Sequence, residues 1–292
     1  MNNSKIYLIN VLLTILMTFA IVGEVALRHV SICSDEKWSL SIIDDNNISS
    51  KVRNNLEKYF NDKYNATGIN ADVYMDALTE DWIDNQIKNV VKNGLDYTNG
   101  KSDNYGFKAD FSELNSSISD FFNAYADENN YVKDSGFEKK IETAQKNAQN
   151  IVISYCDVFK FDKLKSEGVL PQVRHYLGIV NNPVFEILLI ISIAVFISLL
   201  ILVNKKNIKF TLYWAASALI ISGIIMLIPC IYINAVDYFD AFIIKQEQIF
   251  LAFTSFMYNA VNSVMYTSIG LVTVGAVLMI IFSILKSKKN NL

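Results

Sequence analysis

The chain has 292 residues, of which 52% are hydrophobic and 19% are charged, and its formal net charge is -3. This hydrophobic content is more than a soluble domain of that length requires, so the composition indicates an integral membrane protein. Asp and Glu crowd the region between the first and second apolar segments, and an acidic region of this kind argues against a nucleic-acid partner.

Lysines stand at alternating ends of four long apolar segments. In chain order they are Lys5, then Lys205, Lys206 and Lys209, then Lys286, Lys288 and Lys289. Because basic residues are retained on the cytoplasmic side during insertion, this pattern predicts a multi-pass protein of the cell membrane with both termini in the cytoplasm. The lipid bilayer is therefore its first predicted partner.

We expect an all-α integral membrane protein with four transmembrane helices and a mostly helical extracytoplasmic domain inserted between spans one and two. The expected boundaries are 6–28 for transmembrane helix 1, 29–182 for the extracytoplasmic domain, 183–204 and 210–233 for transmembrane helices 2 and 3, 234–260 for an extracytoplasmic amphipathic hairpin, 261–285 for transmembrane helix 4 and 286–292 for a basic cytoplasmic tail.

The first apolar segment resembles a signal peptide in having Lys5 as its basic start. It is long, however, and no A-x-A-like cleavage site follows it, so we interpret it as an uncleaved anchor. The last uncharged segment runs from Gln248 to Leu285 and is longer than one membrane crossing requires, so part of it must protrude from the bilayer.

The insert carries apolar residues at spacings of three and four, which is typical of amphipathic helices. Examples are Val52 with Leu56, and Ile83 with Ile87. We expect four or five helices, with loops at 65–68, 94–106 and 127–134. Ser135, three residues before Glu138, predicts a capping box at the start of the last of these helices.

Small residues at near-helical spacing occur in spans three and four. They are Ala215, Ala218, Ser222 and Gly223 in span three and Gly270 and Gly275 in span four. Small side chains allow helix backbones to approach closely in a membrane, so these positions predict helix packing.

The stretch from Ala71 to Ile83, ADVYMDALTEDWI, lies in the predicted helical insert. Together with the basic turn between spans two and three, it resembles four-span membrane proteins of uncharacterised function from low-GC Gram-positive bacteria. The resemblance implies an architecture. It implies no activity, ligand or site residue.

Ionisable residues are predicted to gather at the outer membrane boundary. The candidate cluster is Glu24, Arg28, His29, Arg174, His175, Asp237 and Asp240. One interpretation is a site for a metal ion, an anionic head group or a proton. The other is structural: the arginines reach lipid phosphates, the histidines lie in the wet interface, and Glu24 pairs with Arg28 at the i, i+4 spacing.

Cys33 and Cys156 both fall in the predicted extracytoplasmic region, near its two ends. They are candidates for a disulfide, and two free thiols are equally compatible with the sequence. No spacing typical of a metal site, calcium loop, nucleotide-binding loop or catalytic triad occurs, so we expect no metal, cofactor or catalytic residue.

These features predict a non-enzymatic sensor, accessory subunit or scaffold that binds a partner through its extracytoplasmic helical domain and associates with itself or with another membrane protein. The alternative is an oligomeric channel or transporter subunit with a pore formed by the four-helix bundles. Its polar lining would come from Asn10, Ser192, Ser198, Thr211, Ser217 and Ser222.

Overall fold

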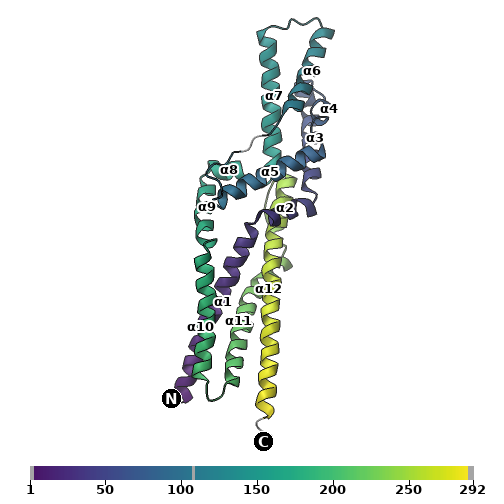
Figure 1. Cartoon of the computed structure of the whole chain (residues 1–292). Helices are drawn as coiled ribbons and strands as arrows, with labels where there is room; N and C mark the ends of the chain where they lie inside the picture. Colours follow the sequence, from purple (N-terminus) through teal and green to yellow (C-terminus); the bar gives the residue numbers. More distant parts are fainter. Residues whose placement is uncertain (1–2, 107–108, 289–292) are drawn as a thin grey trace. The chain divides into compact units, whose positions relative to one another are not determined.

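A computed structural model describes residues 3–106 and 109–288, and every regular element in these ranges is helical (Figure 1). Four of the helices are long and apolar enough to cross a membrane. The predicted all-α class with four candidate spans is therefore confirmed.

The described residues form two compact units. The span unit comprises 3–33, 177–242 and 257–288, and the insert unit comprises 34–106, 109–176 and 243–256. The helices of the span unit are α1 (Asn3–Cys33), α10 (Pro183–Val203), α11 (Lys209–Ala235), the 3-10 helix η1 (Tyr238–Ala241) and most of α12 (Glu247–Lys288).

Helix α1 contacts both α10 and α11 along the span unit. Their shared core includes Leu13 and Met17 of α1, Leu200 of α10 and Ala218 of α11, all of them buried. The other faces of α10 keep large apolar side chains exposed, including Leu188. A helix of this length with exposed apolar side chains is suited to contact with the lipid of a bilayer.

Helices α11 and α12 approach each other closely at two glycines. A Cβ atom added to Gly223 would lie 2.6 Å from Val272 Cγ2 and 2.8 Å from the carbonyl oxygen of Ser268. One added to Gly275 would lie 2.6 Å from Ile220 Cγ1. Both positions therefore require the absence of a side chain, whereas a Cβ on Gly270 would meet no heavy atom of the described residues within 4 Å.

The insert unit is built from eight helical segments and the start of α12. The segments are α2 (Glu36–Asp45), α3 (Ile48–Thr67), α4 (Asp72–Met75), α5 (Glu80–Thr98), α6 (Ser112–Glu128), α7 (Ser135–Cys156), α8 (Phe161–Ser166) and the first part of α9 (Val169–Val180).

The core of the insert unit is formed by the apolar faces of these amphipathic helices. Val52 and Leu56 of α3, Ile83 and Ile87 of α5 and Ile118 of α6 are all fully buried. Burial of one such side chain stabilises a fold by roughly 1.5–3 kcal/mol relative to its exposure. The three- and four-residue spacing in the sequence thus marks the faces that pack.

The segment 234–260, predicted as one amphipathic hairpin, is divided between the two units. It contains the end of α11 and η1, which belong to the span unit, and residues 243–256, which belong to the insert unit. There Ala252 is fully buried in the insert core, and the ring of Phe256 meets the ring of Trp38 at 4.8 Å.

Three local predictions in the insert are wrong. The predicted loop at 65–68 is largely helical, because α3 continues to Thr67. The N-cap of α7 is Asp134, whose Oδ1 accepts a hydrogen bond from the backbone N–H of Phe137 at 2.9 Å, so Ser135 is the first helical residue. The predicted loop at 94–106 starts later, because α5 continues through Gly94 to Thr98. The ring of Phe161 occupies the space that a Cβ at this position would need, at 2.6 Å, so the glycine inside the helix serves close packing.

Candidate functional site

The predicted ionisable cluster does not fall within one unit. Glu24, Arg28, His29, Asp237 and Asp240 belong to the span unit, and the Arg174–His175 pair belongs to the insert unit. The two groups are therefore described separately.

His29 is a buried structural residue of the span unit. Its Nδ1 lies 2.7 Å from the carbonyl oxygen of Val25, and its Nε2 lies 3.2 Å from Thr267 Oγ1 of α12. Because a carbonyl only accepts, Nδ1 carries a proton. Nδ1 thus bonds within α1, and Nε2 joins α1 to α12.

Glu24 lies four residues before Arg28 on α1, but among the described residues no ion pair joins them. Arg28 is exposed, whereas Glu24 Oε2 is buried and lacks a hydrogen-bond partner in the part of the chain that the structure describes. Asp237 and Asp240, at η1, are exposed.

Arg174 is held by the loop that follows α5. Its guanidinium donates to the carbonyl oxygen of Ser102 at 2.9 Å and to Asp103 Oδ1 at 2.7 Å, and it lies 4.9 Å from the ring centre of Tyr97. Its neighbour His175 is exposed and meets the ring of Tyr176 edge-on. Arg174 thus has a structural role in fixing this loop.

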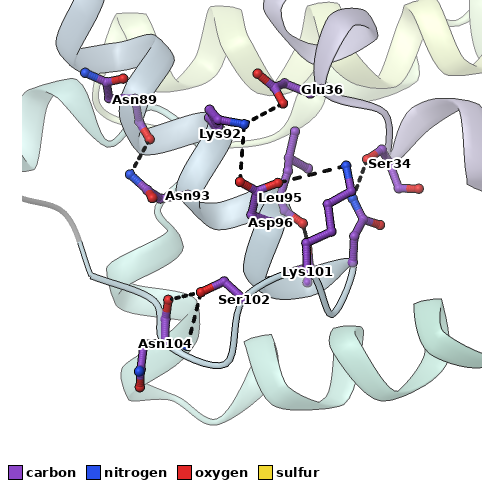
Figure 2. A network of polar contacts seen from close by, with 12 residues as sticks. Ser34, Glu36, Asn89, Lys92, Asn93, Leu95, Asp96, Lys101, Ser102 and Asn104 are labelled. Carbon is purple, nitrogen blue, oxygen red and sulfur yellow. Dashed lines mark hydrogen bonds and ion pairs between the residues drawn. The ribbon is translucent and has the colours of Figure 1, made fainter.

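Charged residues also join α5 to the beginning of α2, next to this loop (Figure 2). Lys92 lies 3.0 Å from Glu36 Oε2 and 3.3 Å from Asp96 Oδ2, and Lys101 lies 3.9 Å from Asp96 Oδ1. The hydrogen bonds to Glu36 and Asp96 raise the pKa of Lys92. The two lysines are exposed and the two carboxylates are half-buried, so these ion pairs contribute modestly to local stability.

Cys33 and Cys156, the candidate disulfide pair, are both free thiols in the structure. Cys156 is buried in the insert core, and this burial raises the pKa of its thiol to about 12. A thiol in that environment is unreactive at neutral pH, because the thiolate is the nucleophile.

Three of the polar side chains considered as a pore lining are engaged inside the span unit. Asn10 is buried and exchanges amide hydrogen bonds with Asn204. Thr211 Oγ1 donates to the carbonyl oxygen of Leu200 at 3.3 Å, and Ser222 Oγ lies 3.3 Å from the carbonyl oxygen of Thr18 and 2.7 Å from that of Ala218. Ser192, Ser198 and Ser217 each donate to a carbonyl of their own helix.

A groove of about 780 Å³ lies in the insert unit, lined mainly by α3 and α7. Its apolar floor is aromatic: the rings of Phe60 and Tyr74 stack with centres 4.0 Å apart and planes 10° apart, and Phe122 of α6 also lines the groove. Phe60 and Tyr74 are buried, and burial raises the pKa of Tyr74 to about 12. This floor is therefore uncharged at neutral pH.

The rim of the groove is basic and polar. Lys63 of α3 and Lys139 and Lys140 of α7 line it, and their side chains are exposed. Lys140 donates to the hydroxyl of Tyr131 at 3.1 Å, and this hydrogen bond raises its pKa, so it stays charged. Among the described residues that line the groove, none is Asp or Glu.

The groove was missed by sequence reasoning because its residues come from separate helices. A partial signal exists within each helix: Phe60, Lys63 and Thr67 share one face of α3, and Lys139, Thr143 and Asn147 share one face of α7. Neither face by itself indicates a binding site.

An apolar floor with a cationic rim suits binding of an anionic group that carries apolar surface.

In the described residues no group of three or more His, Cys, Asp or Glu side chains is arranged to hold a metal ion. Comparison of the chain with protein-family models, curated proteins and solved structures gives no match.

Proposed function

We propose that this protein is a non-enzymatic sensor, accessory subunit or scaffold of the cell membrane, and that its helical insert lies outside the cytoplasm and binds a partner. The observation that carries the proposal is the groove between α3 and α7, in which apolar surface and three lysines face the same space. Concave sites with a mostly apolar lining and a few convergent polar groups are where proteins bind ligands.

The orientation is supported by the lysines that flank the apolar helices. Lys5 precedes the apolar part of α1, Lys205 and Lys206 lie between α10 and α11, and Lys286 lies near the end of α12. With these basic ends in the cytoplasm, the insert between α1 and α10 lies on the other side of the membrane.

A labelling experiment tests this orientation. In a background with Cys33→Ser, Cys156→Ala and Cys230→Ala, single cysteines are introduced as Thr143→Cys in the groove rim and Lys205→Cys in the turn after α10. A membrane-impermeant maleimide added to intact cells labels the first and spares the second. Labelling of Lys205→Cys alone would place the insert in the cytoplasm and refute the proposal.

Partner binding is tested by photocrosslinking in cells. A photoreactive phenylalanine analogue replaces Thr143 in the groove or, as a control, Lys37 on an exposed surface that does not line it. The expected result is a defined higher-mass adduct from Thr143 and none from Lys37. Equal adducts from both sites, or none from either, would contradict a partner site at the groove.

The contacts of the span unit do not favour the alternative of a shared pore. Asn10, Thr211 and Ser222 are buried against helices of the same chain. Side chains that satisfy one another inside one protomer are not available to line an axis between protomers.

A further inference from the structure

The groove is elongated along α7. Its lining residues on that helix run from Gly136 to Ile151, which is roughly 22 Å at about 1.5 Å per residue. The opposite wall is α3, from Tyr59 to Thr67. The α3 wall covers roughly 12 Å at about 1.5 Å per residue, so a third helix that lies along α7 would have both walls beside it for about two turns.

The charges of the groove differ from those of the unit that contains it. Asp and Glu outnumber Lys and Arg in residues 34–176, yet Lys63, Lys139 and Lys140 are the charged residues on the described groove lining. The three lysines attract an anionic ligand to the groove. The acidic excess of the rest of the insert disfavours binding of the same ligand elsewhere on the unit.

The apolar part of the groove lining consists of aromatic and aliphatic side chains. Phe60 and Tyr74 form a stacked, buried pair at the base of the groove, where Ile69 and Ala148 are also buried, and Ile151 is a half-buried apolar residue of the lining. Apolar side chains repeated at i, i+3, i+4 and i+7 on a partner helix would lie on such a floor.

We propose that the groove binds an acidic amphipathic helix of a partner protein. The apolar stripe of that helix lies on the Phe60–Tyr74 floor, and its Asp and Glu side chains pair with Lys63 on one wall and with Lys139 and Lys140 on the other. This proposal rests on the proposed function and specifies the chemistry of the partner at the same site.

The test is calorimetric titration of the full chain, reconstituted in nanodiscs of phosphatidylcholine, with a 16-residue capped peptide. Its sequence places Leu and Phe at i, i+3, i+4 and i+7 and Glu at the remaining positions. The comparison peptide has Lys in place of every Glu. Empty nanodiscs correct for binding of either peptide to lipid, since amphipathic helices also bind bilayers.

Two charge-reversed variants localise the binding. One carries Lys63→Glu, Lys139→Glu and Lys140→Glu in the groove, and the other carries Lys37→Glu, Lys58→Glu and Lys146→Glu on exposed positions outside it. Both change the net charge equally. The acidic peptide is expected to bind the wild type, to bind the groove variant at least tenfold more weakly and to bind the control variant within twofold of wild type.

A measurement that needs no variant is the salt dependence. Binding of the acidic peptide to the wild type is expected to weaken several-fold between 50 mM and 500 mM NaCl, because the exposed lysine pairs are screened. Binding that is equal for the acidic and basic peptides, or equal for the two variants, would overturn the proposal.

Failure of this inference is distinguishable from failure of the proposed function. If neither peptide binds while crosslinking at Thr143 still captures a partner, the groove is a partner site with another chemistry. If decyl phosphate binds with the same lysine dependence and the acidic peptide does not, the occupant is a small anionic amphiphile and the helix proposal is refuted. If crosslinking at Thr143 also yields nothing, both proposals fall.

Discussion

Asn10 and Asn204, which are 194 positions apart in the chain, exchange two amide hydrogen bonds. Asn10 Nδ2 donates to Asn204 Oδ1 at 3.1 Å, and Asn204 Nδ2 donates to Asn10 Oδ1 at 2.9 Å. Both side chains are buried, Asn10 on α1 and Asn204 at the C-cap of α10. The pair fixes the register of these two helices, because a shift of either helix breaks both bonds.

The first prediction concerns this pair. Asn10→Leu leaves the buried Oδ1 of Asn204 without its donor, while Asn204 Nδ2 keeps its hydrogen bond to the carbonyl oxygen of Leu200. The loss is expected to lower the stability of the span unit by about 1–2 kcal/mol. Unfolding in mixed micelles, followed by circular dichroism, measures the change. Adding Asn204→Leu is expected to restore part of the loss, because two apolar groups leave no amide unsatisfied. Unchanged stability of Asn10→Leu would show that the pair contributes nothing.

The second prediction concerns the contact between α11 and α12. Gly223→Ala and Gly275→Ala each place a Cβ 2.6 Å from a side-chain carbon of the facing helix and close to its backbone carbonyl. Each is expected to cost about 1–3 kcal/mol through overpacking. Gly270→Ala is the matched control, because a methyl group there meets open space and Ala is the better helix former. Equal thermal midpoints for all three variants would rule out this close approach.

The third prediction concerns the thiols. Because Cys33, Cys156 and Cys230 are free, a titration with a thiol reagent in dodecyl sulfate without reductant should count three thiols per chain. In the folded protein Cys156 should resist the same reagent, since it is 1% exposed and its thiol has a raised pKa. A count of one thiol before reduction and three after it would instead establish the Cys33–Cys156 disulfide.

The fourth prediction is a loss of insert stability at alkaline pH. Burial raises the pKa of Tyr74 from 10.0 to about 12 and that of Cys156 from 9.0 to about 12. A group with a higher pKa in the folded state binds its proton more tightly there. Its contribution to stability is therefore complete below the unfolded pKa and is lost as the pH rises toward 12.

Tyr74→Phe separates the contribution of Tyr74 from other alkaline effects. The substitution keeps the stack on Phe60 and removes the hydroxyl, so the decline in stability between pH 10 and 12 should be smaller by on the order of 1–2 kcal/mol. Denaturant melts at several pH values measure this slope. Parallel slopes for the wild type and the variant would contradict the prediction.

Much of the fold was predictable from spacing in the sequence. Val52 with Leu56 and Ile83 with Ile87 have the three- and four-residue periodicity of amphipathic helices, and all four side chains are fully buried. Element boundaries were less predictable where a tertiary contact decides them. Glycine is a frequent loop signal, yet Gly94 lies inside α5, where the ring of Phe161, 67 residues later, occupies the space that a Cβ would need.

The candidate site was less predictable than the fold. The ionisable cluster was inferred from residues at similar distances from the apolar segments, and its members are divided between the two units, where His29 and Arg174 are each engaged by neighbours in their own unit. The groove could not be inferred in the same way. Lys63 and Lys139 are separated by the whole of α4, α5 and α6.

The amino-acid sequence alone determined the helical class and the four apolar spans, because an unbroken apolar run and a three-to-four periodicity are properties of one segment at a time. Tertiary structure decided which polar groups meet. The amide pair of Asn10 and Asn204 and the lysine rim over Phe60 and Tyr74 exist only where separate helices pack together, since hydrogen bonds and stacked rings depend on distances of a few ångströms across the fold.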